Sequence, residues 1–289
     1  MWTRPTSPHF RASAHAVPVQ ETTSEFGILG VRDVDFGLER FPPAPDLAAL
    51  VERHWLVTWA LPEGREASVT LLPHPCVNLV LDGDRLAVAG VGRERFTYVY
   101  RGAGRVFGVK FRPGAFRPFL GAPVSTISDV TLPAERVWGP AAGGRAREMA
   151  ALPHVEQLIA AAEGFLRARW PPEDPQVELV GRIVATLLHD REIARVEDVA
   201  DRFGLRLRTL QRLFARYVGV SPKWVLRRDR LHEAAAALAR EQDRPWAEVA
   251  AELGYFDQSH FIRDFTAAIG LTPVAYAQAC LRKQEPVRA

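Results

Sequence analysis

The C-terminal part of the chain repeats one arrangement, and this repeat constrains the fold more than any other feature. A short helical pattern, a glycine and a second helical pattern occur around Gly204 and again around Gly254, about 50 residues further on. In each copy apolar residues recur every three or four positions, as on one face of an α-helix. Glycine permits the sharp turn because it adopts positive φ at no steric cost. The sequence therefore predicts two helix-turn-helix units.

The first copy turns charged and amide side chains outward from its second helix. The first helix, near 196–203, is expected to pack inward through Val196, Val199, Ala200 and Phe203. The second helix is expected to pack inward through Leu207, Leu210, Leu213 and Phe214. The positions left to face outward are Arg206, Arg208, Gln211 and Arg212. Arginine pairs well with guanine in the major groove and glutamine with adenine, so this face is suited to reading bases.

The second copy has an outward set of its own. Asp257 is placed to cap the next helix, and Phe261 and Phe265 fall on its core side. The inward face of its supporting helix is predicted to consist of Trp246, Val249, Ala250 and Leu253. The outward positions, near the helix N-terminus where base contacts are usually made, are Gln258, Ser259, His260 and Arg263. For His260 and Arg263 an ordinary polar helix surface is the alternative.

Positive charge is concentrated between Arg202 and Arg230. This segment has nine Lys or Arg residues against Asp229 alone, a net charge of +8 in a chain whose total is +3. A solvated helix face is the alternative, but such faces usually mix signs. Binding to phosphates needs a local positive field, because neutralised phosphates release their counterions. Lys223 is expected to contact phosphate.

The segment from about 178 to 280 resembles the DNA-binding domain of the AraC/XylS family of transcription regulators. The most specific stretch is "GYFDQSHFIRDF", followed by a Gly-x-Thr-Pro pattern and Tyr276. The resemblance implies seven helices in two helix-turn-helix subdomains bridged by a long helix near 222–240. It also implies that the two reading helices enter successive major grooves, about 34 Å apart. One departure is Arg206, where the family usually has a capping Ser or Thr.

The N-terminal half has the pattern of a β domain. Short runs rich in β-branched and aromatic residues lie within 68–111, and Asp82-Gly83-Asp84 favours a hairpin. A short helix is expected at 45–57, where Asp46 can cap it, and Trp55 and Trp59 are placed one turn apart on it. The fold class is therefore α+β: a small antiparallel β barrel or sandwich with a short helix, followed by the all-α domain.

Parts of this half resemble the sensor-like, distantly cupin-like domain that precedes the DNA reader in some of these regulators. The matching stretches include "LLPHPCVNLVL" and "GVKFRPGAFRPFLGAPVSTISD". His74, Arg112 and Arg117 are candidates for binding a small-molecule effector, with a turn residue and two surface arginines as the alternative. No metal or other cofactor is expected, because His54, His74 and Cys76 lack zinc-ligand spacing.

Composition shifts divide the chain into five segments. We predict a disordered tail at 1–24, the β-rich domain at 25–130, a linker at 131–175 with a helix near 153–170, the DNA-binding domain at 176–282 and a tail at 283–289. The stretch "PPEDP" at 171–175 supplies the main boundary.

The favoured function is sequence-specific binding of double-stranded DNA by a transcription regulator. Its N-terminal domain is expected to bind an effector or to mediate homodimerisation, and RNA polymerase is a further expected partner. No apolar run is long enough to span a membrane and no secretory signal is present, so a cytoplasmic protein is expected. Activation and repression are both left open. The alternatives are a DNA-binding scaffold without an effector, and a bifunctional enzyme whose β domain uses Cys76 as nucleophile.

Overall fold

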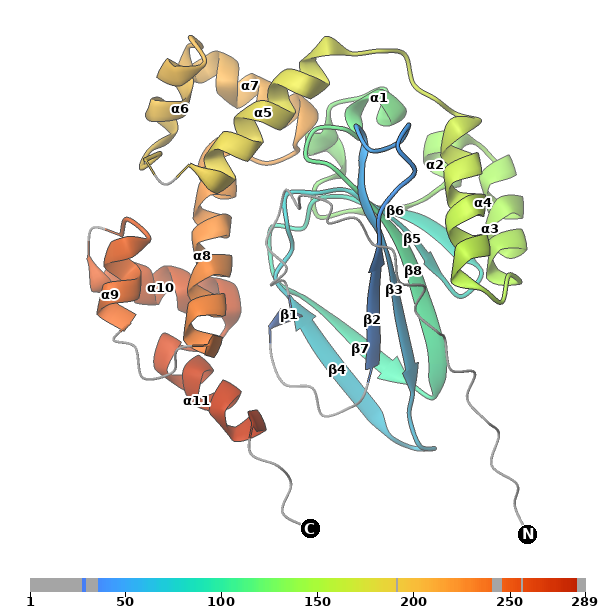
Figure 1. Ribbon diagram of the computed structural model, residues 1–289, viewed down its shortest axis with the longest axis horizontal. Coiled ribbons are helices and arrows are strands. Elements are labelled where there is room, and N and C mark those ends of the chain that lie inside the picture. The colour runs from blue at the N-terminus through green and yellow to red at the C-terminus, as the bar shows by residue number, and fades with distance from the viewer. Residues whose placement is uncertain (1–27, 30–35, 191, 241–245, 256, 285–289) are drawn as a thin grey trace.

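The protein has a strand-rich N-terminal half and a helical C-terminal half (Figure 1). A computed structural model describes residues 28–29, 36–190, 192–240, 246–255 and 257–284. The strands are β1 Ile28–Leu29, β2 Phe36–Phe41, β3 Val51–Ala60, β4 Glu66–Leu71, β5 Asn78–Asp82, β6 Arg85–Ala89, β7 Phe96–Arg101, β8 Ala103–Phe111 and β9 Thr131–Pro133.

The strands form two antiparallel sheets. A larger sheet has the order β2-β3-β8-β5-β6-β9, and a smaller one the order β1-β4-β7. The β5–β6 hairpin turns after the Asp82–Arg85 pair, with Gly83 at φ +58°, as the Asp-Gly-Asp sequence predicts. Long β3 lies second from the edge and pairs with β2 on one side and β8 on the other. The predicted small antiparallel β domain is confirmed.

The helix predicted at 45–57 is wrong. Residues 47–50 form turns, and the chain is extended from Val51 to Ala60. Residues four apart share a face in a strand as well as in a helix, so the spacing of Trp55 and Trp59 fits either structure. Pairing with two neighbouring strands decides the outcome. On β8, Gly108 and Gly104 leave room for these two indoles, which lie directly over them.

Helices cover one face of the larger sheet. They are α1 Arg117–Leu120, the 3-10 turn η1 Val124–Ile127, α2 Glu135–Trp138, α3 Ala141–Ala150 and α4 Val155–Arg167. Helix α4 confirms the helix predicted near 153–170, whereas α2 and α3 were not predicted. Figure 1 shows α3 and α4 beside the sheet. Met149 and Phe165 are each 1% exposed within the core that these helices share with the sheet.

A buried polar contact fixes α4 to the sheet. The Oε1 atom of Glu163 lies 3.2 Å from Nε2 of His54 on β3 and accepts a hydrogen bond from the Ala44 backbone at 2.7 Å. One turn later Arg167 pairs with Asp46 through two hydrogen bonds of 2.7 and 2.8 Å. Asp46 thus anchors α4 from the segment before β3 instead of capping a helix.

In the part of the C-terminal half that the structure describes there are seven helices, the number that the family resemblance implies. They are α5 Pro175–His189, α6 Val196–Arg202, α7 Leu207–Tyr217, α8 Pro222–Arg240, α9 Trp246–Glu252, α10 Gln258–Ile269 and α11 Pro273–Gln284. The long α8 matches the predicted bridging helix in both bounds. Within the described residues, no helix has the length and hydropathy that crossing a membrane would require.

The N-terminal domain touches both helix-turn-helix units. The first unit belongs to the same hydrophobic core as the sheet, and the second has its own core, which includes Leu72 from the end of β4. Ser128 Oγ donates to the Gly219 carbonyl at 2.7 Å, beyond the end of α7. The left-handed Gly270 that ends α10 lies directly against the guanidinium of Arg95. The two halves therefore form one packed body.

We expect the substitution Gly108→Ala to destabilise the fold. A Cβ at Gly108 would lie 2.2 Å from the Trp55 indole, which is hydrogen-bonded to Asn78 and cannot easily move. Overpacking of this kind costs roughly 1–3 kcal/mol. Gly144→Ala, in α3 with no atom within 4 Å of the new Cβ, is the matched control and should be neutral or slightly stabilising. Chemical denaturation of both variants measures the difference; equal midpoints would contradict the close Trp55–Gly108 packing.

Candidate nucleic-acid interface

The first helix-turn-helix unit is built from α6, Gly204 and α7. Gly204 has φ +61°, a conformation that a residue with a Cβ adopts only at a cost. Val199 and Ala200 from α6 are buried, as are Leu210 and Phe214 from α7, both 0% exposed. These contacts set the angle between the helices and leave the opposite side of α7 in solvent.

The predicted reading residues of α7 are all exposed. Arg208, Gln211 and Arg212 point away from the buried stripe, and Arg206 precedes the helix. Arg206 makes no side-chain cap, so the N-terminal N–H groups of α7 are not satisfied by it. These N–H groups and three arginines are suited to binding an anion such as phosphate. Lys223, in the first turn of α8, is exposed as well.

The second unit repeats this construction with α9, Gly254 and α10. Gly254 has φ +71°, and the Asp257 side chain caps α10 by accepting from the His260 backbone at 2.7 Å, as predicted. Phe261 and Phe265 are 0% exposed. On the other side of α10 the residues predicted to read bases, all exposed, are Gln258, Ser259, His260 and Arg263. In the supporting helix Val249 and Ala250 are buried and Leu253 is half-buried, while the Trp246 side chain lies outside the described residues.

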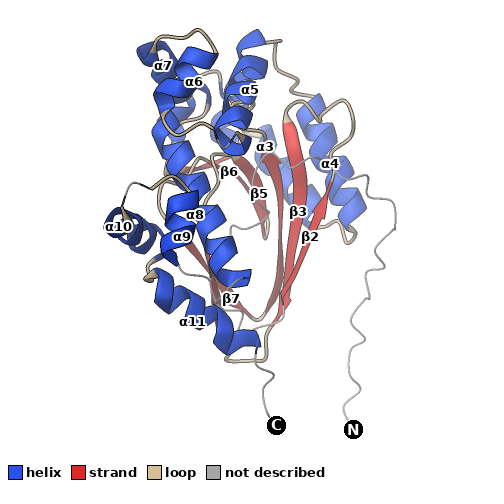
Figure 2. Cartoon of the chain, turned by 60° about the vertical axis from the view of Figure 1, so that its left-hand side comes forward, coloured by secondary structure: helices blue, strands red, loops and turns tan. Residues whose placement is uncertain are grey.

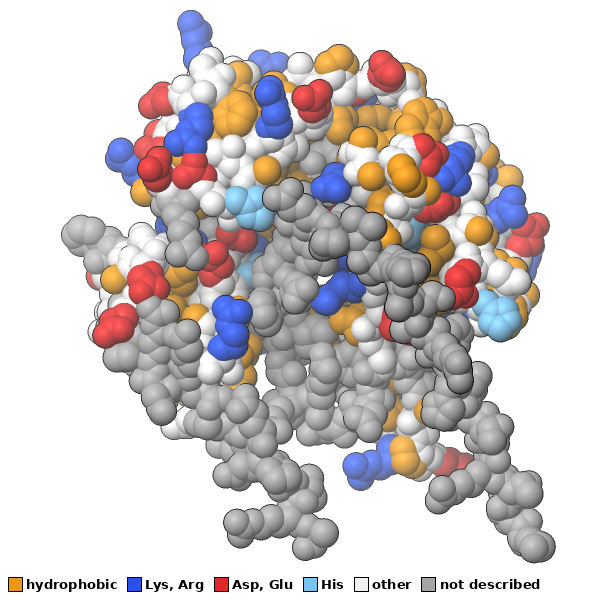
Figure 3. Space-filling view, in the orientation of Figure 1, with side chains coloured by type: hydrophobic (Ala, Val, Ile, Leu, Met, Phe, Trp, Pro, Cys, Tyr) orange, Lys and Arg blue, Asp and Glu red, His pale blue; other side chains and the backbone are white. Residues whose placement is uncertain are grey.

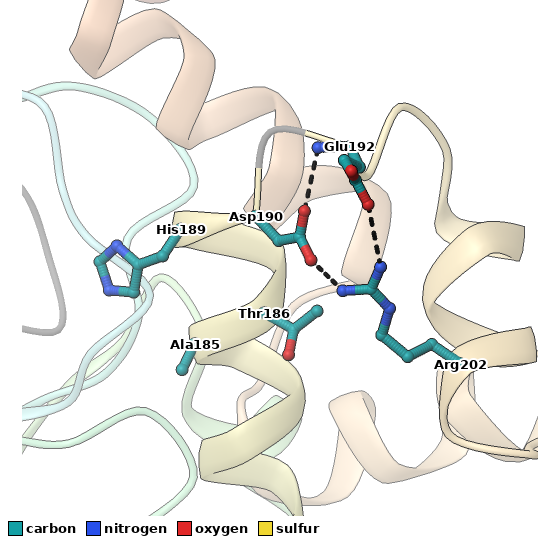
Figure 4. A pocket seen from close by; sticks show the side chains of 6 residues that line it. All are labelled: Ala185, Thr186, His189, Asp190, Glu192 and Arg202. Atoms are coloured by element: carbon teal, nitrogen blue, oxygen red, sulfur yellow. Dashed lines mark hydrogen bonds and ion pairs between the residues drawn. The ribbon is translucent and has the colours of Figure 1, made fainter.

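Only part of the +8 charge of segment 202–230 is available to a ligand. Arg202 pairs with Asp190 and, at 3.5 Å, with Glu192 beside a hollow of about 670 Å³ between α5 and α6 (Figure 4). Arg227 pairs with Asp264, and Arg228 is 5% exposed. Figure 3 accordingly shows acidic and basic side chains interspersed over α5 to α7 on that face. The positive surface is narrower than the sequence count suggests, and the exposed cations cluster on and beside α7.

Helix α8 sets the separation of the two units. Its 19 residues span about 28 Å at 1.5 Å per residue, close to the roughly 34 Å between successive major grooves. In Figure 2, α7 and α10 both lie at the edge of the molecule away from the sheets. The two exposed polar helices, carried by units that α8 connects, form the candidate nucleic-acid interface.

Comparison with known proteins agrees with this geometry. Residues 199–279 match a family described as a helix-turn-helix domain. The two-unit construction of this domain is similar to the DNA-binding domain of the AraC family. Residues 39–133 match a family described as a domain of unknown function, DUF6597. In this chain that domain precedes the helix-turn-helix domain.

The curated relatives match about a third of the chain. The HTH-type transcriptional activator RhaS of Escherichia fergusonii is 36% identical over 85 residues, 29% of this chain and 30% of the relative. The uncharacterized HTH-type transcriptional regulator YidL of Escherichia coli K12 is 34% identical over 104 residues, 36% of this chain and 35% of the relative. The match thus spans about a third of each relative's length.

Solved structures of ToxT from Vibrio cholerae align over most of both chains at low similarity. One is 10% identical with a TM-score of 0.35, covering 86% of this chain and 99% of that one. Another, described as bound to an unsaturated fatty acid, is 11% identical with a TM-score of 0.35. Similarity at this level identifies no shared ligand or contact.

The structure does not gather the three predicted effector residues into one site. The Arg112 side chain donates to the Ala48 carbonyl at 2.6 Å. Arg117 lies 3.9 Å from Asp174 and over the ring of Tyr217, at the junction with the AraC-type domain. The third residue, His74, stacks on His232 of α8. Each of the three has different partners, and Arg112 holds a turn of the N-terminal domain.

The contacts of α8 with the N-terminal domain were not predicted from the sequence. His232 of α8 is 1% exposed and stacks on His74 with ring centroids 4.2 Å apart and planes 6° from parallel. Arg228 donates to the Arg93 carbonyl at 2.5 Å. Its pKa is lowered to about 10 by burial and by neighbouring Arg227. In the sequence, Arg228 is one more residue of a basic helix, and nothing distinguishes it from its exposed neighbours.

Cys76 has the environment of a structural residue. Its side chain is 3% exposed, and burial raises the pKa of the thiol to about 12. A nucleophilic cysteine needs a thiolate near neutral pH, which positive and partly exposed surroundings provide. The thiol of Cys76 stays protonated instead, which agrees with the interpretation of Cys76 as a small buried residue. Neither Cys76 nor Cys280 forms a disulfide.

We expect the contact between His74 and α8 to weaken at acidic pH, because His74 becomes protonated. Although the residue is only half-buried as a whole, protein atoms surround its ring, and burial together with the cations Lys110, His232, Arg53 and Arg228 holds its pKa well below 6.5. Below about pH 6.5 the unfolded chain therefore binds a proton at His74 more readily than the folded chain does. The free energy of unfolding falls as the pH drops, by up to about 1.4 kcal/mol per pH unit.

The variant His74→Phe keeps a stacking ring and removes the titrating group. Its unfolding free energy should fall less than that of the wild type between pH 7.5 and pH 5.5, as measured by urea denaturation. The control His189→Phe replaces an exposed histidine at the end of α5 and should behave as the wild type. Identical pH profiles for His74→Phe and the wild type would contradict the prediction.

Proposed function

We propose that the protein is a sequence-specific DNA-binding transcription regulator. The observation that carries this proposal is the pair of helix-turn-helix units on α8, each with an exposed polar reading helix. An isolated unit would be weaker support, because polar helix surfaces are common. Here each unit is held by a buried apolar face, and the α8 helix that connects the units is about as long as one turn of DNA. This arrangement is suited to two units that bind successive major grooves on one side of a duplex.

The exposed side chains divide into two roles. Arg208, Gln211 and Arg212 in α7, with Gln258, Ser259, His260 and Arg263 in α10, are assigned to base edges. Arginine and glutamine offer the paired donors and acceptors that distinguish base pairs in the major groove. Arg206 and Lys223 are assigned to phosphates, which hold the protein in register without reading sequence.

The N-terminal domain is proposed to control the AraC-type domain in the cytoplasm. It packs on the first unit, on α8 and on the end of α10, so a ligand or a second copy that changes its shape changes both readers. Such control requires the ligand to bind two states of the protein with different affinities. A homodimer on repeated half-sites would gain affinity through effective concentration. RNA polymerase is a further proposed partner, consistent with curated relatives named as transcriptional activators. A catalytic β domain is not proposed, because nothing around Cys76 favours it.

The substitutions Arg212→Ala and Arg263→Ala test the assignment of base contacts. Each should relax base preference at one position of the bound site by about 1–3 kcal/mol, roughly 5- to 150-fold, because one paired contact is lost. Sites selected from random DNA by the wild-type protein supply the reference, and competition with single-base variants of that site measures the loss. If both variants kept the full wild-type preference, the recognition assignment would be wrong.

Two further variants separate reading from general attraction. Lys223→Ala should weaken binding to all sequences alike and reduce its salt dependence, because only a phosphate contact is removed. Arg145→Ala removes an exposed arginine of α3, far from the reading helices in sequence and fold, and should change neither property.

A further inference from the structure

A buried carboxylate connects the second reading helix to the bridge between the two units. Asp264 of α10 is 8% exposed, and its Oδ1 atom accepts a hydrogen bond of 2.7 Å from Nη2 of Arg227. Arg227 belongs to α8, so this ion pair joins two helices that are separated by 37 positions in sequence. Figure 2 shows α10 beside α8. A charge-assisted hydrogen bond of this length constrains the orientation of α10 on its support more than apolar packing alone.

The second oxygen of the same carboxylate faces a predicted reading residue. Oδ2 of Asp264 lies 3.5 Å from Nε2 of His260, one helical turn earlier in α10. The His260 side chain is 52% exposed, so packing alone does not fix its ring. The ring also meets Tyr255 edge to face, with centroids 5.6 Å apart. Asp264 and Tyr255 thus hold His260 from two sides while its outer edge stays in solvent.

We propose that Asp264 is a positioning residue that sets the base preference of the second reading helix without touching DNA. The inference rests on the proposed function. A carboxylate at the DNA surface would repel phosphates, but Asp264 is buried behind His260. It acts through two neighbours: Arg227 fixes the helix on α8, and His260 is held at the angle at which it meets a base edge. Readout by paired hydrogen bonds depends on such orientation.

The test uses the full-length variant Asp264→Asn, which preserves the shape of the side chain and removes its charge. Discrimination at the half-site read by α10 should fall about tenfold, while discrimination at the half-site read by α7 stays within twofold of the wild type. Affinity for non-specific DNA and its salt slope should not change, because no phosphate contact is lost. The control Asp201→Asn removes an exposed carboxylate of α6 and should leave both half-sites unchanged.

A variant from the other end of the ion pair separates positioning from a loss of folding. The Arg227 side chain is 48% exposed, so Arg227→Gln should fold, and circular dichroism checks this. It should affect the same half-site, and the double variant should lose no more than Asp264→Asn alone, because residues acting as one unit are not additive. In nuclear magnetic resonance spectra, the His260 ring signals should move in Asp264→Asn and stay in place in Asp201→Asn.

Three results would overturn the inference: equal losses at both half-sites, no loss at either, or additive losses in the double variant. Failure of the proposed function gives a different result, in which the wild-type protein itself selects no sequence from random DNA.

Discussion

The arrangement of the DNA-binding half depends on α8, because one helix contributes to two separate cores. Its N-terminal part, with Val225 and Leu226, packs into the core shared with the sheet, whereas Leu231, Ala235 and Leu238 pack into the core of the second unit. A helix resists bending, so the distance and angle between the two units follow from the side chains at its two ends. The pair formed by Arg227 and Asp264 adds a polar restraint where α10 meets this helix. The predicted reading helices are therefore placed by their supports.

Through α8 the N-terminal domain is connected to both helix-turn-helix units. Arg93 contacts Arg228, which lies between the parts of α8 that belong to the two cores, and His74 contacts His232, next to Leu231 of the second core. Leu72 reaches the second core directly. These contacts bury arginine and histidine, which is costly unless the groups are hydrogen-bonded or neutral. A seam made this way is held less firmly than an apolar core, and a change in charge or shape on the N-terminal side alters its strength.

The C-terminal half was predictable from the sequence because its signals are local. Glycines at 204 and 254, the cap at Asp257 and the helical period of buried residues each depend on a few neighbouring positions, and all were confirmed. The strand at β3 was not predictable, because the pattern of Trp55 and Trp59 suits a helix equally well and only the glycines of β8, some 50 residues away, decide between them. The contacts of His232, Arg228 and Asp264 also depend on partners distant in sequence. Counting charged residues in the sequence does not show which arginines are already paired with carboxylates or carbonyl groups in the folded protein.

The pairing of arginines within the domain explains why a narrow basic surface is enough. Arg202, Arg227 and Arg228 are engaged by carboxylates or a carbonyl, which leaves the exposed cations close to α7 and the first turn of α8. The second unit presents Gln258, Ser259 and His260 with a single arginine, Arg263, so it offers less general attraction to phosphate and more hydrogen-bonding capacity toward bases. This unequal distribution of cations fits a DNA-binding protein in which the first unit supplies most of the attraction to the duplex. In the proposed function the second unit then adds discrimination, and that contribution depends on how accurately α10 is held against α8.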